Sequence, residues 1–437
     1  MPIQKPAISL IALAAAAISP AHADDALRAA IAADYKENLE PLFKHFHANP
    51  ELSHREFETS KRLAAEIEAL GFAVTTGVGG TGVVAVMENG DGPTVMLRAD
   101  MDGLPVKEDT GLSYISKATQ EDIDGEVKPV MHACGHDTHI TSLVGAARQL
   151  AARKDQWGGT LVLIGQPAEE RISGARDMLE DGLYKRFPKP DYALAFHVSA
   201  QMPSGKIKVS EAAAYSSADS VDITVYGVGA HGASPHKGVD PVLIASQIVV
   251  SLQSVVARSI DPLQPGVITV GSIHGGTKHN IIGDQVHLQL TVRSDSPDVR
   301  EKLLDGIDRV TEGVALSMGA PKDKLPKVVR SPTETTPPTV NDAETARTIK
   351  AAFLENFGAE TLYDKPRQGM GAEDFAYFVT PELGVKGVYF AVGGTPEKDL
   401  ARAASHHSPF FKIEPEPAIT VGTEAMVVGA MTLMAKE

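Results

Sequence analysis

The 437-residue sequence has a single cysteine, Cys134, so an intrachain disulfide is impossible. It also lacks an excess of basic residues, because 41 Lys and Arg stand against 56 Asp and Glu and leave a formal net charge of −15. Binding to nucleic acid depends on Lys and Arg that neutralise phosphates, so this composition argues against nucleic acid and anionic membrane surfaces as partners. With 43% hydrophobic and 22% charged residues, the chain is neither disordered, collagen-like nor membrane-embedded.

The amino terminus predicts a secretory signal peptide over residues 1–23. Lys5 supplies a positive charge, residues 8–18 form an apolar run, and Ala21-His22-Ala23 is a cleavage site of the small-x-small type. The run is shorter than the roughly 20 residues that cross a bilayer. The sequence therefore predicts an exported protein, periplasmic or secreted, with no membrane contact after processing. An uncleaved anchor or a buried helix is the alternative.

Length and hydrophobic patterning predict more than one domain, since a domain averages roughly 150 residues. Short segments that are apolar on both faces alternate with helical stretches in the first half of the chain, which predicts a mostly parallel sheet covered by helices. The segments expected to form strands are residues 83–86, 95–97, 161–164 and 193–196, with a helix at 139–152.

Around residue 215 the pattern changes. Val221, Ile223 and Val225 alternate with polar residues, as in a half-buried strand. The elements expected next are a helix at 241–257, strands at 267–272 and 286–292, a helix at 299–316 and a strand at 327–330. The order βαββαβ is the split βαβ arrangement. It predicts a domain at 215–331 inserted between two parts of the first domain, at 24–214 and 332–437, with a Pro- and Thr-rich linker at 331–342.

Residue types that bind metals gather where the expected strands end. Asp100 and Asp102 follow one strand, Glu169-Glu170 follows another, and His197 ends a third. The segment 131–139 (M-H-A-C-G-H-D-T-H) opens a helix, and His406-His407 lies near the carboxyl terminus. Because sites in open α/β sheets form outside the carboxyl ends of the strands, these segments are expected to converge.

Each of these motifs alone also has a structural explanation. The Cys134-x-His136 pair fits a buried thiol beside a capping histidine, Asp100 a loop cap, the paired glutamates a solvated loop, and His197 a satisfied core residue. Their joint occurrence in this order favours a metal centre.

Taken together, the strings R-A-D-M-D-x-L-P, M-H-A-C-G-H-D and Q-P-A-E-E resemble the binuclear-metal aminoacylase and carboxypeptidase family. The resemblance is closest to the branch that contains hippurate hydrolase and the plant auxin–amino acid conjugate hydrolases, and it runs from about Tyr35 to the carboxyl terminus. It implies an α/β catalytic domain of the zinc-peptidase type with an inserted ferredoxin-like α+β lid. This division agrees with the one that the patterning predicts.

The resemblance implies two divalent metal ions, zinc or manganese in the first place, with cobalt and nickel as further options. Imidazole, carboxylate and thiolate are all suitable donors. Cys134 would bridge the ions where other branches use a carboxylate. Asp100 stands where those branches have a ligand histidine, and Asp102 is expected to accept the free N–H of a ligand histidine. The ligands that the resemblance assigns are Cys134, His136, Glu170, His197 and His407.

Glu169 matches the general base of the family. A metal-activated water would attack an amide carbonyl while Glu169 takes its proton and later protonates the departing amine. In the lid, His231 matches a histidine that donates to the oxyanion or the substrate, often across a dimer, so a homodimer through the lid is expected. Asn280 matches a substrate-binding asparagine, although Gly283 replaces the usual proline. Arg293 would bind a substrate carboxylate or form a salt bridge at the sheet edge.

These residues predict a secreted, metal-dependent amidohydrolase that releases an amino acid from an N-acyl amino acid or a related small amide. A dipeptidase or carboxypeptidase is the alternative within enzymes, and it would require a free α-amino group on a small peptide. A non-catalytic periplasmic solute- or metal-binding protein on the same scaffold is the alternative outside them. Glu169 argues against that class, because a binding site has no need of a spare base.

Overall fold

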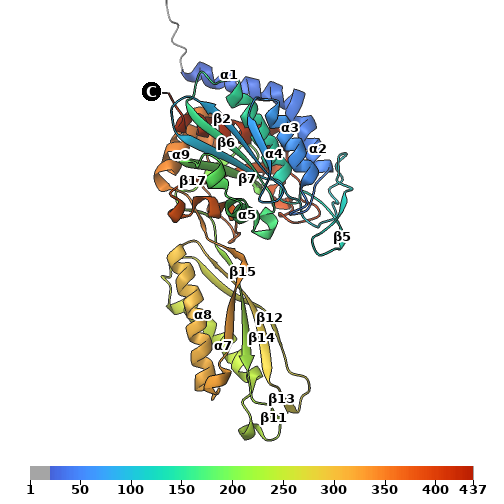
Figure 1. The fold of residues 1–437 in the computed structure, drawn as a ribbon, viewed down its shortest axis with the longest axis vertical. Helices are drawn as coiled ribbons and strands as arrows, with labels where there is room; N and C mark the ends of the chain where they lie inside the picture. Colours follow the sequence, from blue (N-terminus) through green and yellow to red (C-terminus); the bar gives the residue numbers. More distant parts are fainter. Residues whose placement is uncertain (1–19, 437) are drawn as a thin grey trace, which may run out of the picture.

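The structure is a computed structural model that describes residues 20–436, with side chains from Asp25 onward. The apolar run at residues 8–18 lies outside the described residues. Figure 1 shows two separate bodies: an α/β domain that carries both ends of the described chain, and an elongated domain built from its middle third.

A seven-stranded sheet, in the order β1-β2-β6-β3-β7-β17-β8, forms the centre of the α/β domain. The strands are β1 (Ala73–Val78), β2 (Gly82–Asn89), β3 (Thr94–Asp100), β6 (Gly159–Gln166), β7 (Tyr192–Pro203), β8 (Ile207–Val209) and β17 (Lys386–Thr395). The four strands β6, β3, β7 and β17 run parallel, whereas β1, β2 and β8 pair antiparallel. The sheet is mixed, but β1 runs in the same direction as these four strands, so five of the seven strands agree with the expectation of a mostly parallel sheet and only β2 and β8 oppose them. The tight turn between β1 and β2 is too short for a parallel crossover.

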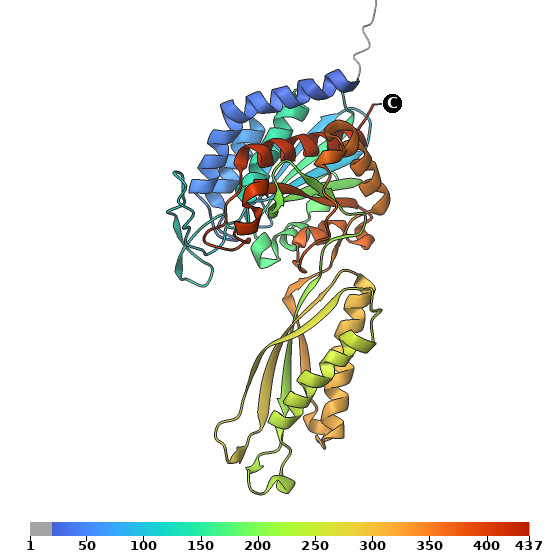
Figure 2. The same cartoon turned by 180° about the vertical axis from the view of Figure 1, so that it is seen from behind.

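Helices cover both faces of this sheet, which explains why the middle residues of its central strands are apolar. In β3, Val95 and Leu97 belong to the core on one face, while Met96 between them belongs to the core on the other. The first face carries α1 (Pro20–Asp34), α2 (Glu40–Ala48), α3 (Phe57–Glu68), α4 (His136–Ala151), α9 (Ala343–Phe357) and α10 (Pro415–Leu433). The second carries α5 (Gly174–Glu180), α6 (Leu183–Arg186) and a 3-10 turn (Asp374–Val379). Figure 2 shows α1 and α10 together on the first face.

The elongated domain is a four-stranded antiparallel sheet in the order β12-β14-β10-β15, with two helices packed on it. Its elements are β10 (Ala218–Tyr226), α7 (Pro241–Arg258), β12 (Gly266–Gly275), β14 (Gln285–Ser294), α8 (Pro297–Ser317) and β15 (Lys327–Thr336). Val221, Ile223 and Val225 are all buried in its core, as their alternation predicts. Counted along the chain, the strand order is 2-3-1-4, which is the ferredoxin-like arrangement, so the predicted fold class is confirmed.

The lid joins the α/β domain through two adjacent chain segments. The short strands β9 (Ala213–Tyr215) and β16 (Thr339–Val340) pair with each other at this junction. The linker expected from residue 331 begins later than predicted, because β15 continues to Thr336 and pairs there with Ala218. Thr335 and Asp219 are joined by a 2.8 Å hydrogen bond, which holds this extension of the strand in place.

Candidate metal centre

The predicted ligand segments converge at the carboxyl ends of β3, β6 and β7. Asp100 is the last residue of β3, Glu169 begins a 3-10 turn just after β6, and His197 lies in the middle of β7. Cys134 and His136 lie at the start of α4, whose N-cap Gly135 has a φ of +88°. A side chain at position 135 would clash with Val198, because a Cβ there would lie 2.4 Å from its Cγ1.

Cys134 occupies the middle of the cluster. Its Sγ forms one group of potential donors with His136 and Glu170, and another with His197 and His406. Within each group the donor atoms lie within 4.8 Å of one another, and Sγ is 3.3 Å from Nε2 of His197. A thiolate at this position could therefore contact two ions at once.

Two buried atoms beside Cys134 fit a cation. Nε2 of His136 and Oε1 of Glu170 lie 3.9 Å apart, and neither has a hydrogen-bond partner among residues 20–436. Nδ1 of His136 lies 2.8 Å from the backbone carbonyl of Asp102 and donates to it, so the lone pair is on Nε2. Buried polar atoms in native proteins nearly always have a partner, and a metal ion between these two atoms would satisfy both.

The buried acidic groups of the cluster also favour the binding of a cation. Burial, and then the neighbouring Glu170 and Glu169, raise the pKa of the Cys134 thiol well above its usual range. Burial likewise raises the pKa of Glu170 to about 8, although His136 lowers it. A bound divalent ion would lower the raised pKa of the thiol, since a coordinated thiol is deprotonated outright.

The hydrogen bonds of two other histidines separate a candidate ligand from a structural residue. Nδ1 of His197 lies 2.6 Å from the carbonyl of Val198 and donates to it, which leaves the Nε2 lone pair facing Cys134. In His139, Nδ1 donates to Asp100 over 2.5 Å and Nε2 accepts the N–H of Val198 over 2.9 Å. Both nitrogens of His139 are thus already used, so His139 orients Asp100 and β7 and has no lone pair for a metal.

Asp102 secures the turn that carries the two glutamates. Its carboxylate accepts the backbone N–H groups of Glu169 and Glu170, each over 3.1 Å, and the hydroxyl of Ser53 over 2.6 Å. The predicted contact with a ligand histidine is made chiefly by its backbone carbonyl, because the carboxylate is 3.3 Å from Nδ1 of His136. Asp102 therefore positions both the ligand histidine and the glutamate turn.

Sequence reasoning missed Glu56, which is fully buried behind the same turn. Its carboxylate accepts the N–H of Ala168 over 2.8 Å and the hydroxyl of Thr81 over 2.5 Å. Ala168 has a φ of +49°, a left-handed conformation that is unusual for a residue other than glycine. Such conformations cluster at functional sites, and here the hydrogen bond that Ala168 donates to Glu56 helps to hold one in place.

The adjacent glutamates face different neighbours. Glu170 lies 3.4 Å from Nε2 of His407, whereas Glu169 groups with the buried Glu373 and Asp374. Burial, and then Glu373 and Glu170, raise the pKa of Glu169 well above its usual value. The Glu169 carboxylate accepts no hydrogen bond from the described residues. Glu169 is therefore available beside the ligands rather than among them.

His406 and His407 both reach the centre. His407 is 56% exposed at its side chain, and its φ is +66°. His406 is more deeply placed, with Nδ1 3.7 Å from Sγ of Cys134, and it was not among the residues predicted to have a role. Tyr215, at the junction with the lid, is a further neighbour whose ring lies 6.1 Å from the His197 ring.

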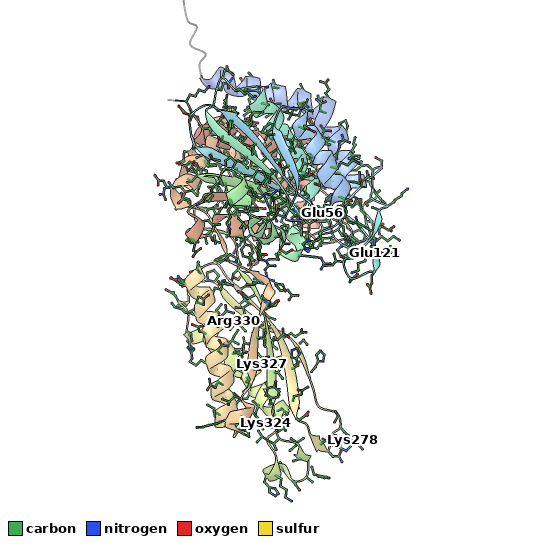
Figure 3. All side chains as sticks on the ribbon, in the orientation of Figure 1. Glu56, Glu121, Lys278, Lys324, Lys327 and Arg330 are labelled. Atoms are coloured by element: carbon green, nitrogen blue, oxygen red, sulfur yellow. The ribbon has the colours of Figure 1, made fainter. Side chains whose placement is uncertain are left out.

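The predicted lid residues His231 and Asn280 lie far from this cluster within one chain. They are neighbours at the tip, where the N–H of Gly232 donates to the carbonyl of Asn280 over 2.8 Å. Figure 1 places β11 (Ala230–His231) and β13 (Ile281–Ile282) at the end of the lid remote from the α/β domain. Figure 3 shows the same separation between Lys278 at the tip and Glu56 in the α/β domain.

Arg293 lies at the opposite end of the lid, near the junction, where Ser294 contacts Ser217. Its Nε donates to the hydroxyl of Thr291 over 3.2 Å, and it forms no ion pair with any described side chain. The alternative of a sheet-edge salt bridge was wrong, since β14 lies between β12 and β10.

Arg98 forms a buried ionic network under the centre. Its guanidinium contacts Asp100 at 2.6 Å, Glu373 at 2.8 Å and Asp374 at 3.3 Å, and it donates to Gln166 over 2.7 Å. Glu373 and Asp374 belong to a glycine-rich segment at residues 369–375, which thus contributes to this network. Arg98 joins strand β3 to a segment nearly three hundred residues away.

Replacing Arg98 by Met is expected to lower the free energy of unfolding by about 3–5 kcal/mol, because the acidic partners would remain buried without a counter-charge. Urea denaturation of the α/β domain measures this loss. The matched control is Arg62→Met, since Arg62 pairs with Glu66 on the surface of α3 and such a pair contributes only about 0.3–0.5 kcal/mol. Equal losses in the two variants would contradict the structural role of Arg98.

Comparison with known proteins gives a consistent result over most of the chain. The family described as Peptidase family M20/M25/M40 matches residues 96–430. The thermostable carboxypeptidase 2 of Saccharolobus solfataricus is 37% identical, over 84% of this chain and 88% of its own. The hippurate hydrolase of Campylobacter jejuni is 36% identical, over 79% and 86%. The IAA-amino acid hydrolase ILR1-like 2 of Arabidopsis thaliana is 35% identical, over 85% and 79%.

A solved structure shows the same architecture. The YxeP protein of Bacillus subtilis, described as a dinuclear metal binding peptidase from the M20 family, superimposes with a TM-score of 0.74 and is 27% identical. The superposition covers 94% of this chain and 99% of that one, so it includes both the α/β domain and the lid.

Proposed function

The chain belongs to peptidase family M20/M25/M40, and from this premise we propose that it hydrolyses the amide bond of N-acyl amino acids at the Cys134 centre. Its membership confirms the predicted family and makes the chain a metal-dependent amidohydrolase or peptidase. The observation that carries the proposal is the pair of buried atoms on His136 and Glu170, beside the shared thiol, that have no hydrogen-bond partner in the described part of the chain. Two of the relatives have names that denote hydrolysis of amino acid conjugates, which supports this substrate class.

The residues that would hold two divalent ions are Cys134, His136, Glu170, His197 and His407. Zinc or manganese suits this set of imidazole, carboxylate and thiolate donors, with cobalt or nickel as further options. When bound, such ions acidify a water molecule and polarise the carbonyl of the scissile amide.

Glu169 would act as the general base and then as the general acid. Its carboxylate takes a proton from the attacking water and delivers it to the nitrogen of the departing amine. A carboxyl group with a raised pKa holds that proton between the two steps more readily than an exposed one. Asp102 and Glu56 fix the backbone on which Glu169 stands, so little orientation is lost during the reaction.

A homodimer through the lid would bring His231 and Asn280 to the centre of the partner chain. The outer face of α7 supports this arrangement, because Val242, Leu243 and Val250 are 43%, 58% and 66% exposed there. By length and mean hydropathy, α7 would also pass as a membrane-spanning helix. Its opposite face, with Ile244 and Ile248, packs into the core of the lid. The apolar outer face would instead be covered by a second lid.

Mixing two inactive variants tests the shared site. In a heterodimer of His231→Ala with Glu169→Gln, one centre receives Glu169 from its own chain and His231 from the partner. Random exchange at equal amounts should therefore restore about a quarter of the wild-type rate. A mixture as inactive as its components, although light scattering shows a dimer, would contradict the role of His231 across the dimer.

A substrate panel tests the reaction itself. The protein loaded with zinc or manganese is incubated with hippurate, other N-acyl amino acids and dipeptides, and the released amino acid is quantified. Turnover of the N-acyl amino acids above that of Glu169→Gln is expected. A requirement for a free α-amino group would favour a dipeptidase or carboxypeptidase, and binding without cleavage would favour a solute-binding protein.

We also propose that the chain is exported through residues 1–23. Amino-terminal sequencing of protein from a bacterial periplasmic fraction should give a chain that begins at Asp24. An intact amino terminus in the membrane fraction would favour an uncleaved anchor.

A further inference from the structure

His406 has two different hydrogen-bond partners, one on each ring nitrogen. The backbone N–H of Ala200 lies 3.2 Å from Nε2, and Sγ of Cys134 lies 3.7 Å from Nδ1. The imidazole is also held between two rings, with the centroid of Phe411 at 4.7 Å and that of His197 at 5.2 Å. These contacts fix the orientation of His406 as well as its position.

The backbone partner determines where the ring proton is. An amide N–H can only donate, so Nε2 of His406 must accept with its lone pair. An imidazole whose Nε2 is unprotonated carries its proton on Nδ1. That proton points toward the sulfur of Cys134, and Nδ1 therefore has no lone pair to offer a metal ion.

We infer that His406 is a positioning residue that donates an N–H···S hydrogen bond to Cys134 and is not a metal ligand. The inference rests on the proposed metal centre and deepens it, because it leaves His407 as the ligand from this dipeptide. His407 fits that role, since its Nε2 faces Glu170 at 3.4 Å. The two adjacent histidines thus have different roles: His407 binds the metal, and His406 donates a hydrogen bond to the thiolate.

A hydrogen bond to a metal-bound thiolate has a defined chemical effect. It withdraws electron density from the sulfur, so the thiolate neutralises less of the charge of the ions that it bridges. Ions held by this thiolate would then polarise the substrate carbonyl more strongly. The bond also orients the sulfur, which belongs to both groups of potential donors.

Two substitutions divide the functions of the imidazole. In His406→Gln the side-chain carbonyl can accept the N–H of Ala200 in place of Nε2, while the donor to sulfur is lost. In His406→Asn the side-chain amide can donate near the position of Nδ1, while the acceptor for Ala200 is lost. Each variant is the control for the other, and both are compared with His407→Gln.

The test uses the full-length protein loaded with cobalt(II), with circular dichroism to establish folding. We expect His406→Gln to keep the cobalt content of the wild type and to shift the thiolate-to-cobalt charge-transfer band to lower energy. Its kcat should fall by about 10–100-fold. The band of His406→Asn should remain near that of the wild type. His407→Gln should lose cobalt.

Two results would overturn the inference. If folded His406→Gln loses as much cobalt as His407→Gln, then His406 is a ligand. If the band of His406→Gln coincides with that of the wild type, then His406 does not donate to the sulfur. Failure of the proposed metal centre is distinguishable, because the wild type itself would then bind no cobalt or show no thiolate band.

Discussion

Replacing Glu169 by Gln is expected to lower kcat by about 10²–10⁴-fold while the metal content of the protein stays unchanged. Glutamine preserves the shape of the side chain but cannot take a proton from water. The structure places Glu169 beside the ligands, with Oε2 3.8 Å from Nε2 of His136, and groups it with Glu373 and Asp374. Steady-state kinetics at saturating metal, together with elemental analysis of the same sample, measures both quantities.

Glu170→Gln is the matched control, because it makes the same chemical change at the neighbouring position. Glu170 has Oε1 directed at His136 and Oε2 at His407, so its loss should release metal. Its activity should recover in part when the metal concentration is raised, whereas that of Glu169→Gln should not. If Glu169→Gln loses metal instead, or keeps full activity, the assignment of the general base is wrong.

The elements of the fold were predictable where their patterning is local. Strands β3 and β6 were recognisable as short apolar runs because both of their faces are buried. The alternation at Val221, Ile223 and Val225 identified β10 because only one face of the lid sheet is covered. The direction of β1, β2 and β8 was not predictable in the same way, since it depends on which strands become neighbours. Pairing is a property of the whole sheet.

The site was predictable to the level of segments and not always to that of residues. Motifs at strand ends predicted that Asp102 and the Glu169-Glu170 pair would lie together, because parallel strands deliver their carboxyl ends to one edge. Cys134 and His136, at the start of α4, were assigned through the family resemblance. Glu56 and the ion pairs of Arg98 with Glu373 and Asp374 were missed, since these contacts join distant segments. The different tasks of His406 and His407 follow from the backbone N–H of Ala200, which no spacing in the sequence reveals.

The single cysteine gives the second large prediction. Cys134→Ser is expected to weaken the binding of both metal ions, each by about 10²–10³-fold, if the free energy of binding is shared roughly equally among the donors of an ion. A serine hydroxyl is not ionised near neutral pH and is a poor substitute for thiolate. Because Sγ belongs to both groups of donors, one substitution should affect two ions.

His197→Gln distinguishes this shared role from that of a terminal ligand. His197 belongs to only one of the groups that contain Cys134, so its loss should weaken one ion and leave the other bound. Isothermal titration of the metal-free proteins gives the two affinities, and elemental analysis after dialysis gives the stoichiometry. Loss of a single ion from Cys134→Ser would show that the thiolate does not bridge. Retention of both would remove Cys134 from the ligand set and leave the buried atoms of His136 and Glu170 without their common neighbour.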